Sequence, residues 1–396
     1  MSEQRLCYLD NNATTQVAPE VVDAMLPFLR DMWGNPSSAY GFGSQVADHV
    51  RTAREQLAAM INSEPSEIIF TSCGTESNNS AFLSALAVQP GKRHVITTKV
   101  EHSANMSFGR LLEKRGYEVT YLPVESDGSI DICVLQEAIR PDTALVSIMW
   151  ANNETGVLTT LEEAAAICRM HGVMFHTDAV QVPGKVAIDV KNLGIDMMSL
   201  SAHKLHAPKG VGLLYVKSGT KYESFVTGGG QERGRRGGTE NVASIVGFGR
   251  AAQLAVDTLD EENTRVRALR DRLEQTILKT IPNTSRNGNA EQRLPNTSNI
   301  AFAGIEAEAL LLLLNKENIC ASSGSACTTG SLKPSHVLTS MGLREDLAQG
   351  SIRFSLGIYN TEEDIDLVLE KLPGMIDHLR GNMPGATEAA TAVANG

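Results

Sequence analysis

The chain has 396 residues, more than one hydrophobic core usually organises, so two domains are expected. Its 35 Lys and Arg against 46 Asp and Glu give a net charge of −11, which repels nucleic-acid phosphates and anionic membranes, and neither is an expected partner. The N-terminus has no apolar segment of the secretory type, and six scattered cysteines without a CxxC pair indicate reduced thiols and a cytoplasmic location.

From about residue 66 the sequence alternates short apolar runs with helix-like segments. The apolar runs, rich in β-branched and aromatic residues, predict seven strands at 67–72, 94–100, 117–124, 144–152, 173–180, 196–202 and 211–217. Strands that alternate with helices favour an α/β fold with a mainly parallel sheet covered on both faces. Ligands of such sheets bind at the carboxyl ends of the strands, so the functional residues are expected in the loops that follow them.

After residue 239 the pattern changes. The amphipathic stretch 243–281 is interpreted as one long helix or two in succession and is predicted to connect two domains, and short strands and helices then indicate a smaller α+β unit. The predicted organisation is an N-terminal segment 1–15 packed with the small domain, a large domain 16–260, a small domain 261–380 and a disordered tail 381–396.

Two charged residues lie where predicted strands end. Lys204 follows the strand 196–202 in a loop bounded by Gly and Pro, where its amine is placed to form a Schiff base with an aldehyde. Taken alone, it also fits a solvated surface lysine. Asp178 ends the preceding strand, where a carboxylate either keeps the pyridine nitrogen of pyridoxal phosphate protonated or caps a following helix.

A phosphate site is predicted where the strand 67–72 leads into a helix. Gly74 and Thr75 form the turn, and the first free N–H groups of the helix, with the Thr75 hydroxyl, make a cradle for an anion. The same segment also fits an ordinary capping box completed by Glu76.

Further polar residues follow two other strands. His102 is placed to stack over a planar cofactor and to move protons, although a lone loop histidine is often structural. Asn152 and Asn153 either hold a cofactor hydroxyl or substrate carboxylate, or only shape their turn.

Several other motifs do not support a site. The sequence has no nucleotide P-loop, and the motif GFGRAA at 247–252 lies inside a helical stretch, so we interpret its glycines as allowing close helix packing. His203 and His206 have no acidic or thiol neighbours, which disfavours zinc. The basic run RGRRGG at 233–238 is interpreted as contacting phosphate, a carboxylate or another subunit.

Cys327 lies in the segment ASSGSACTTGS, 321–331, which is made of small and hydroxylated residues. A structural cysteine prefers an apolar pocket, and this segment has little side-chain volume to bury. The pattern therefore predicts a mobile loop, at about 321–333, that carries a reactive thiol.

Together these segments resemble the cysteine desulfurases, pyridoxal-phosphate enzymes of the aminotransferase class V superfamily. The resemblance extends from residue 8 to residue 357. The motifs that carry it, in the family's order, are LDNNATT, GNPSS, FTSCGTES, MWANNETG, HTDAVQ, LSAHKLHAPKGVG, GGGQERGRRGGTEN and SSGSACTTGSLKPSHV. The residues of these motifs are most similar to those of the nitrogen-fixation type, followed by those of the housekeeping iron–sulfur-assembly type. The resemblance implies fold type I of the pyridoxal-phosphate transferases.

The resemblance also implies a role for each matching residue. Lys204 would be the Schiff-base lysine, Asp178 the partner of the pyridine nitrogen, His102 the stacked ring and Cys327 the sulfur acceptor. The residues expected to bind the cofactor are Gly74, Thr75, His102, Asn153, Asp178, Gln181, Ser201, Ala202, His203, Lys204 and Thr239, the last from the neighbouring subunit of a homodimer. The residues expected to bind the substrate are Asn35, Asn153 and Arg353.

The implied reaction converts L-cysteine to L-alanine and leaves a persulfide on Cys327. The sulfur would pass to an iron–sulfur scaffold protein, with nitrogenase maturation as the expected pathway, and Cys327 would transiently bind a cluster on that scaffold. Lys333 stands where relatives commonly carry an acid, which bears on the choice of partner. The alternatives are another class V pyridoxal-phosphate enzyme, such as a selenocysteine lyase or aminotransferase, and a non-enzymatic thiol carrier.

Overall fold

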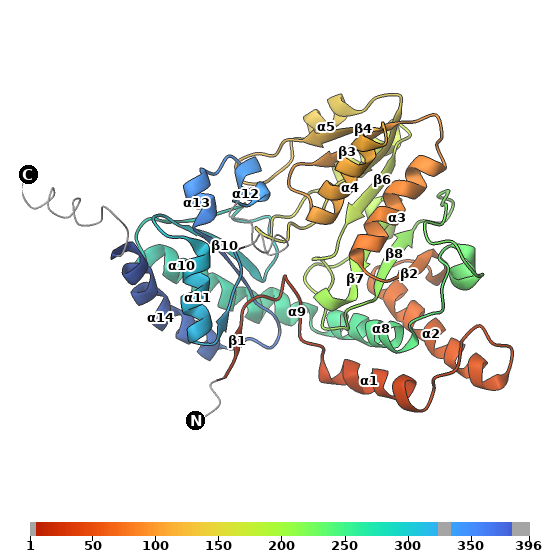
Figure 1. Ribbon diagram of the computed structural model, residues 1–396, viewed down its shortest axis with the longest axis horizontal. Coiled ribbons are helices and arrows are strands. Elements are labelled where there is room, and N and C mark those ends of the chain that lie inside the picture. The colour runs from red at the N-terminus through yellow and green to blue at the C-terminus, as the bar shows by residue number, and fades with distance from the viewer. Residues whose placement is uncertain (1–4, 324–333, 382–396) are drawn as a thin grey trace, which may run out of the picture.

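The structure is a computed structural model that describes residues 5–323 and 334–381. Its larger part is built on a sheet whose described strands coincide with the seven predicted runs (Figure 1). They are β2 Ile68–Thr71, β3 His94–Thr98, β4 Glu118–Leu122, β5 Thr143–Ser147, β6 Met174–Asp178, β7 Met197–Ser201 and β8 Gly212–Val216. The strand order is β2-β8-β7-β6-β5-β3-β4, and only β8 runs antiparallel to its neighbours. The predicted mainly parallel α/β sheet is confirmed.

Helices cover both faces of this sheet. Successive strand residues point to opposite faces, so Val95 and Leu145 enter one core while Ile96 and Val146 enter another. The first core packs against α3 and α4, which lie in front of the strands in Figure 1, and the second packs against α1, α2, α6 and α8. The helices of this part are α1 Pro19–Arg30, α2 Gly41–Met60, α3 Gly74–Ala87, α4 Ser103–Lys114, α5 Ile132–Ala138, α6 Leu161–Met170, α7 Val190–Leu193 and α8 Val242–Asp257.

The glycines of the motif GFGRAA lie where α8 crosses α1 and α2. A Cβ at Gly249 would lie 2.6 Å from the Cα of Ala53, and one at Gly247 would lie 2.7 Å from the Cγ of Met25. Any larger residue would push the helices apart, so the interpretation of this motif as a packing surface is confirmed.

Most of the remaining elements pack around a third core, distinct from the two that flank the large sheet, whereas the short helices within 336–349 pack against Val100 in a small cluster of their own. The predicted helical stretch 243–281 is observed as α8 followed by α9 Leu259–Glu261, the π-helical turn η4 Glu262–Val266 and α10 Arg267–Thr280. The other elements are β9 Thr284–Arg286, β10 Thr297–Phe302, α11 Ala307–Lys316, β11 Ile319–Cys320, α12 His336–Ser340, α13 Glu345–Gln349, β12 Ser351–Ser355 and α14 Glu362–Gly381. Strand β1, Cys7–Tyr8, pairs in parallel with β11, so the N-terminal segment joins this core. The predicted domain boundaries stay predictions.

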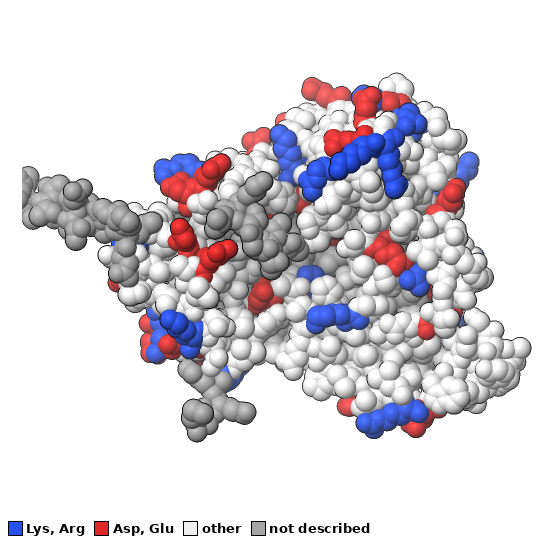
Figure 2. Space-filling model, in the orientation of Figure 1, with Lys and Arg blue, Asp and Glu red and all other residues white. Residues whose placement is uncertain are grey.

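The surface carries both signs of charge. Figure 2 shows Lys and Arg side chains interspersed with Asp and Glu around the rim of one face. Across 5–323 and 334–381, no helix has the length and apolar character needed to cross a membrane.

Candidate active site

A cavity of about 350 Å³ opens at the carboxyl ends of the central strands. It brings together most of the residues singled out in the sequence. Those that line it are Gly74, Thr75, His102, Asn153, Asp178, Gln181, Ser201, His203, Lys204 and Arg353. Five of the segments that carry them lie at the carboxyl ends of β2, β3, β5, β6 and β7, which meet at one edge of the sheet. Arg353 is the exception, because it comes from a strand, Ser351–Ser355, of the three-stranded sheet.

Three predicted residues lie away from this cavity, and a fourth, Cys327, falls outside the described part of the chain. Ala202 is fully buried between Ser201 and His203 and does not line the cavity. Asn35, in the loop between α1 and α2, is exposed and accepts a hydrogen bond from the backbone N–H of Ser37. Thr239 lines a separate cavity of about 160 Å³. Cys327 lies outside the described residues, as do the cluster-binding role assigned to it and most of the tail predicted to be disordered.

Lys204 closes a 3-10 turn, η2 Ala202–Lys204, directly after β7. Its Nζ donates hydrogen bonds to the carbonyl oxygens of Asn12, at 2.5 Å, and Ala13, at 2.7 Å. The amine is therefore held in the cavity by the N-terminal segment, and the alternative of a solvated surface lysine is wrong.

Asp178 is the last residue of β6 and is only 3% exposed. Its Oδ2 accepts a hydrogen bond of 2.7 Å from Nδ2 of Asn78, and its Oδ1 accepts one of 3.1 Å from the N–H of Val180. Gln181 donates its Nε2 to the carbonyl of Asn12 at 2.9 Å. The amide oxygens of Gln181 and Asn78 are buried without a hydrogen-bond partner among the described residues. Such orphaned acceptors indicate that a polar ligand belongs beside them.

The N-terminus of α3 faces the same cavity. Cys73 occupies its N-cap position without a side-chain capping bond, so the first N–H groups of the helix are left for an anion. Glu76 accepts from the N–H of Ser72 at 2.8 Å and from Arg236 at 2.9 Å. Burial opposes the charge of Glu76, but these two partners lower its pKa. Because Ser72 precedes the N-cap residue Cys73, this bond is not part of a capping box, and Glu76 mainly anchors the loop that carries Arg236.

Two histidines flank the cofactor side of the cavity. Burial, reinforced by the nearby charge of Lys204, lowers the pKa of His203 to about 4, so His203 is neutral at pH 7. Its Nδ1 lies 3.2 Å from the Oγ1 of Thr14. His102 caps α4, and its Nδ1 accepts a hydrogen bond from the N–H of Ala104 at 3.2 Å.

Arg353 forms the opposite wall. It is 2% exposed, and its Nη2 donates to Oδ1 of Asp10 at 2.6 Å while its Nη1 donates to the carbonyl of Asn153 at 2.8 Å. The two predicted carboxylate-binding residues are therefore in direct contact. The Nε of Arg353 is buried and has no acceptor within the described part of the chain.

Three site residues were missed by the sequence reasoning. Asn12 and Asp10 lie in the quoted motif LDNNATT, but their partners Lys204 and Arg353 are far away in the sequence. Asn78 lies four residues after Gly74, on the same face of α3, and this helical spacing was the available signal.

The described residues, which exclude 324–333 and both chain ends, contain no group of three or more His, Cys, Asp or Glu placed to hold a metal ion.

Comparisons with known proteins agree with this geometry. The family model of aminotransferase class-V matches residues 7–368. The chain is 55% identical to cysteine desulfurase 2 of Trichormus variabilis over 383 residues, 97% of this chain and 96% of that protein. It is 53% identical to cysteine desulfurase NifS of Azotobacter vinelandii over 378 residues, 95% of this chain and 94% of that protein.

Solved structures give the same result. A NifS-like protein superposes with a TM-score of 0.89 at 38% identity, covering 94% of this chain and 100% of that chain. A structure of SspA in complex with cysteine superposes with a TM-score of 0.78 at 36% identity, covering 89% of this chain and 99% of that chain. The chain therefore belongs to the cysteine desulfurases of the aminotransferase class-V family.

Proposed function

We propose that the protein converts L-cysteine and an enzyme thiol to L-alanine and an enzyme persulfide, with Cys327 as the thiol. The observation that carries the proposal is the meeting of Lys204, Asp178 and His102 on one cavity beside the N-terminus of α3. The relatives named cysteine desulfurase, and the solved neighbour in complex with cysteine, support the same substrate.

Pyridoxal phosphate is the cofactor of this family, and the cavity suits it. The N-terminus of α3, with Ser201 and His203, would hold the phosphate, and Lys204 would hold the aldehyde carbon. Asp178 would bond the ring nitrogen, and the unpartnered Oε1 of Gln181 would accept from the phenolic oxygen. When bound, the cofactor withdraws electrons and so stabilises negative charge at the α-carbon of the substrate.

The chain's own residues would bind the substrate and move its protons. Arg353 and Asn153 would orient the cysteine carboxylate, since a guanidinium fork matches a carboxylate. The Lys204 amine would take the α-proton, and His102 would take a proton from the thiol; both line the same cavity. The Cys327 thiolate would then attack the substrate sulfur, so that an S–S bond forms as the Cβ–S bond breaks and the β-carbon is protonated to alanine.

The described residues on both sides of Cys327 support this role. The backbone of Ser322 pairs with that of Arg353 at 3.1 and 2.6 Å. The hydroxyl of Ser335 donates to Oε2 of Glu154 at 2.5 Å, and Glu154 adjoins Asn153. The segment that contains Cys327 therefore begins and ends beside the two residues that would bind the substrate carboxylate.

A homodimer is the proposed assembly. Large apolar side chains are exposed on α1 and the loop after it, among them Leu29 at 65% and Trp33 at 74%. Asn35 follows the same helix and, like Thr239, lies away from its own cavity, as expected of residues that complete the site of a neighbouring subunit.

The destination of the sulfur is also a proposal. We infer delivery to an iron–sulfur scaffold protein, for nitrogenase maturation, in the cytoplasm. The similarity to NifS of Azotobacter vinelandii supports the pathway, and the free cysteines of the described residues support a reducing compartment.

The test is the release of alanine and sulfide from L-cysteine and a reductant by the wild type, Lys204→Ala and Cys327→Ala. We expect activity in the wild type alone. Full desulfuration by Cys327→Ala would favour a selenocysteine lyase or aminotransferase, and absence of alanine with the wild type would contradict the proposal.

A further inference from the structure

A second, smaller cavity lies beside Lys204. Its volume is about 20 Å³, and its walls include Lys204, Lys185 and Glu262. Lys204 lines both this space and the active-site cavity, so it forms part of the wall between them. A space of this size holds one water molecule, provided that polar groups face it.

Lys185 is one such group. It is 5% exposed, and its Nζ lies 3.5 Å from the carbonyl oxygen of Lys204, a long hydrogen bond for an ammonium that carries three donors. Lys185 also follows the loop that begins at Asp178, and its own carbonyl accepts a 2.9 Å hydrogen bond from Nδ2 of Asn263.

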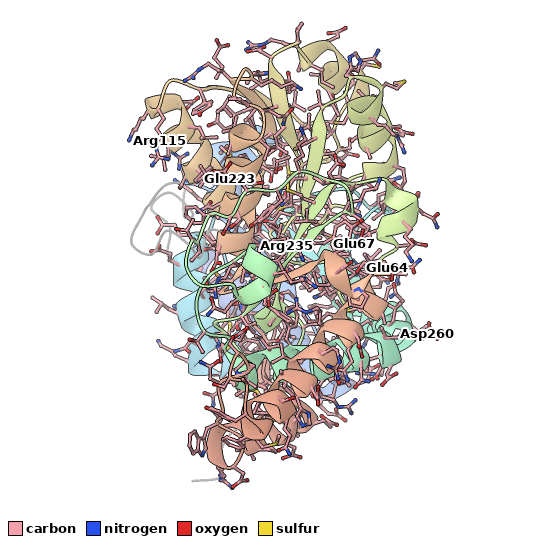
Figure 3. All side chains as sticks on the ribbon, turned by 90° about the vertical axis from the view of Figure 1, so that its right-hand side faces the viewer. Glu64, Glu67, Arg115, Glu223, Arg235 and Asp260 are labelled. Atoms are coloured by element: carbon pink, nitrogen blue, oxygen red, sulfur yellow. The ribbon has the colours of Figure 1, made fainter. Side chains whose placement is uncertain are left out.

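Glu262 supplies the opposite charge. It is 5% exposed, and its Oε2 has no hydrogen-bond partner among the described residues. The π-helical turn η4 begins at Glu262 and turns its side chain inward, whereas Asp260 on α9, labelled in Figure 3, lies at the edge of the molecule. π-helical turns are frequent at functional sites, and a buried carboxylate without a partner requires an explanation.

We propose that one buried water in this cavity bridges Nζ of Lys185 and Oε2 of Glu262, and that this bridged pair positions Lys204 from behind. The proposal rests on the reactive role of Lys204 in the proposed function. The pair also links Lys204 to the helical junction between the large-sheet core that contains Val146 and the core of the smaller part, because Glu262 and Asn263 lie in the same turn and both face Lys185.

The pair also sets the charge behind Lys204. Burial raises the pKa of Glu262 to about 7, against the attraction of Lys185 and Arg265 and with the repulsion of Glu261. Burial lowers the pKa of Lys185, and Glu262 opposes that shift. His206, which also lines the cavity, is kept neutral because burial lowers its pKa to about 4. As the pH falls through about 7, Glu262 takes up a proton and its negative charge no longer offsets a positive charge on Lys185.

The test uses the holoenzyme and the variants Lys185→Met, Glu262→Gln and the double variant, with Lys191→Met as a control because Lys191 is 53% exposed. The first readout is the pH midpoint of the absorbance change of the cofactor bound at Lys204. Lys185→Met removes a neighbouring cation and raises this midpoint, whereas Glu262→Gln leaves that cation unbalanced and lowers it. Each shift is about half a pH unit, or threefold in the protonation equilibrium, and the double variant returns towards the wild type.

The second readout is a double-mutant cycle on unfolding midpoints. We expect the two single substitutions to be non-additive, and a crystal structure that resolves waters to show one in the cavity. Additive effects or a dry cavity would overturn the bridge. Wild-type pH midpoints in both variants would overturn the positioning role, even if stability changed. The double-mutant cycle and the bound water can be measured whether or not the protein is an active desulfurase. A failure of the proposed reaction would show itself differently, as absence of alanine formation by the wild type.

Discussion

The side-chain amide of Asn78 donates a hydrogen bond of 2.7 Å to the carboxylate of Asp178, and both side chains are at most 3% exposed. Asn78 lies just over one turn into α3, and Asp178 ends β6. The helix whose N-terminus would bind the phosphate therefore also holds the carboxylate that would face the ring nitrogen. One rigid element thus sets both ends of the cofactor site.

Replacing Asn78 tests this arrangement. Asn78→Ala removes one of two donors to Asp178, and a hydrogen bond to a charged group contributes about 1.5–3 kcal/mol. We expect kcat/KM for alanine formation to fall by roughly 10- to 100-fold. Asn79→Ala, at the next position of α3 and away from the cavity, is the control. An unchanged kcat/KM in Asn78→Ala would show that the hydrogen bond from the N–H of Val180 is enough to hold the carboxylate of Asp178.

The turn before α3 gives a second prediction. A Cβ at Gly74 would lie 2.8 Å from Cγ2 of Val180, so Gly74→Ala must displace either α3 or the segment after Asp178. Overpacking of this kind costs about 1–3 kcal/mol, and we expect the apparent Kd for pyridoxal phosphate to rise by roughly 5- to 100-fold.

A compensating change separates this clash from other effects. Gly74→Ala combined with Val180→Ala makes room for the new methyl group, so cofactor affinity should return to within a few-fold of that of Val180→Ala alone. No recovery in the double variant would mean that the added Cβ acts by some route other than contact with Val180.

The sequence predicted much of the fold because the relevant signals are local. Each of the seven strands is a short apolar run, and Lys204 and Asp178 were found because polar residues directly follow or end such runs. Because the carboxyl ends of parallel strands lie at one edge of a sheet, loops that are distant in the sequence could then be predicted to share one site.

The contacts that hold the site were not predictable in the same way. Asp10 forms an ion pair with Arg353, and the carbonyl of Asn12 accepts a hydrogen bond from Lys204. In each case the two partners are far apart in the sequence and meet only when the chain has folded. Asp10 and Asn12 lie in an irregular segment without periodicity, so no pattern shows which side chain or carbonyl they contact. Asn35 and Thr239 lie away from the cavity of their own chain, and no pattern in the sequence indicates this.

A buried carboxylate beside the site predicts a pH dependence of stability. Glu101 accepts hydrogen bonds from Thr98, Asn105 and the N–H of Met149, yet burial, with repulsion from Asp178, raises its pKa from 4.5 to about 7. The folded state thus prefers the protonated form. The stability from this group is full below about pH 4.5 and is lost as the pH rises through 7, by about 3 kcal/mol at pH 8.

Glu101→Gln removes this dependence. The unpartnered Oδ1 of Asn105 can accept from the new amide, so the variant should fold. Its free energy of unfolding relative to the wild type should rise by about 3 kcal/mol from pH 5 to pH 8, measured by urea denaturation of the holoenzyme. The exposed Glu137→Gln is the matched control. A difference that stays constant with pH would contradict the prediction.

The bond between Ser335 and Glu154 gives the last prediction. Besides donating to Glu154, the Ser335 hydroxyl accepts from the N–H groups of Val337 and Leu338 and so caps α12. Ser335→Ala loses the cap and a bond to a buried carboxylate, so the free energy of unfolding should fall by about 2–3 kcal/mol.

The functional consequence follows from where Ser335 lies. Ser335 fixes the chain just after the segment that contains Cys327, so its loss should lower kcat for alanine formation. KM should change less, because Arg353, which would bind the substrate carboxylate, is not altered. Ser340→Ala, at the other end of α12, should alter stability by less than about 0.5 kcal/mol. Equal effects of the two serine substitutions on kcat would show that the contact with Glu154 does not position the segment, because only Ser335 makes it.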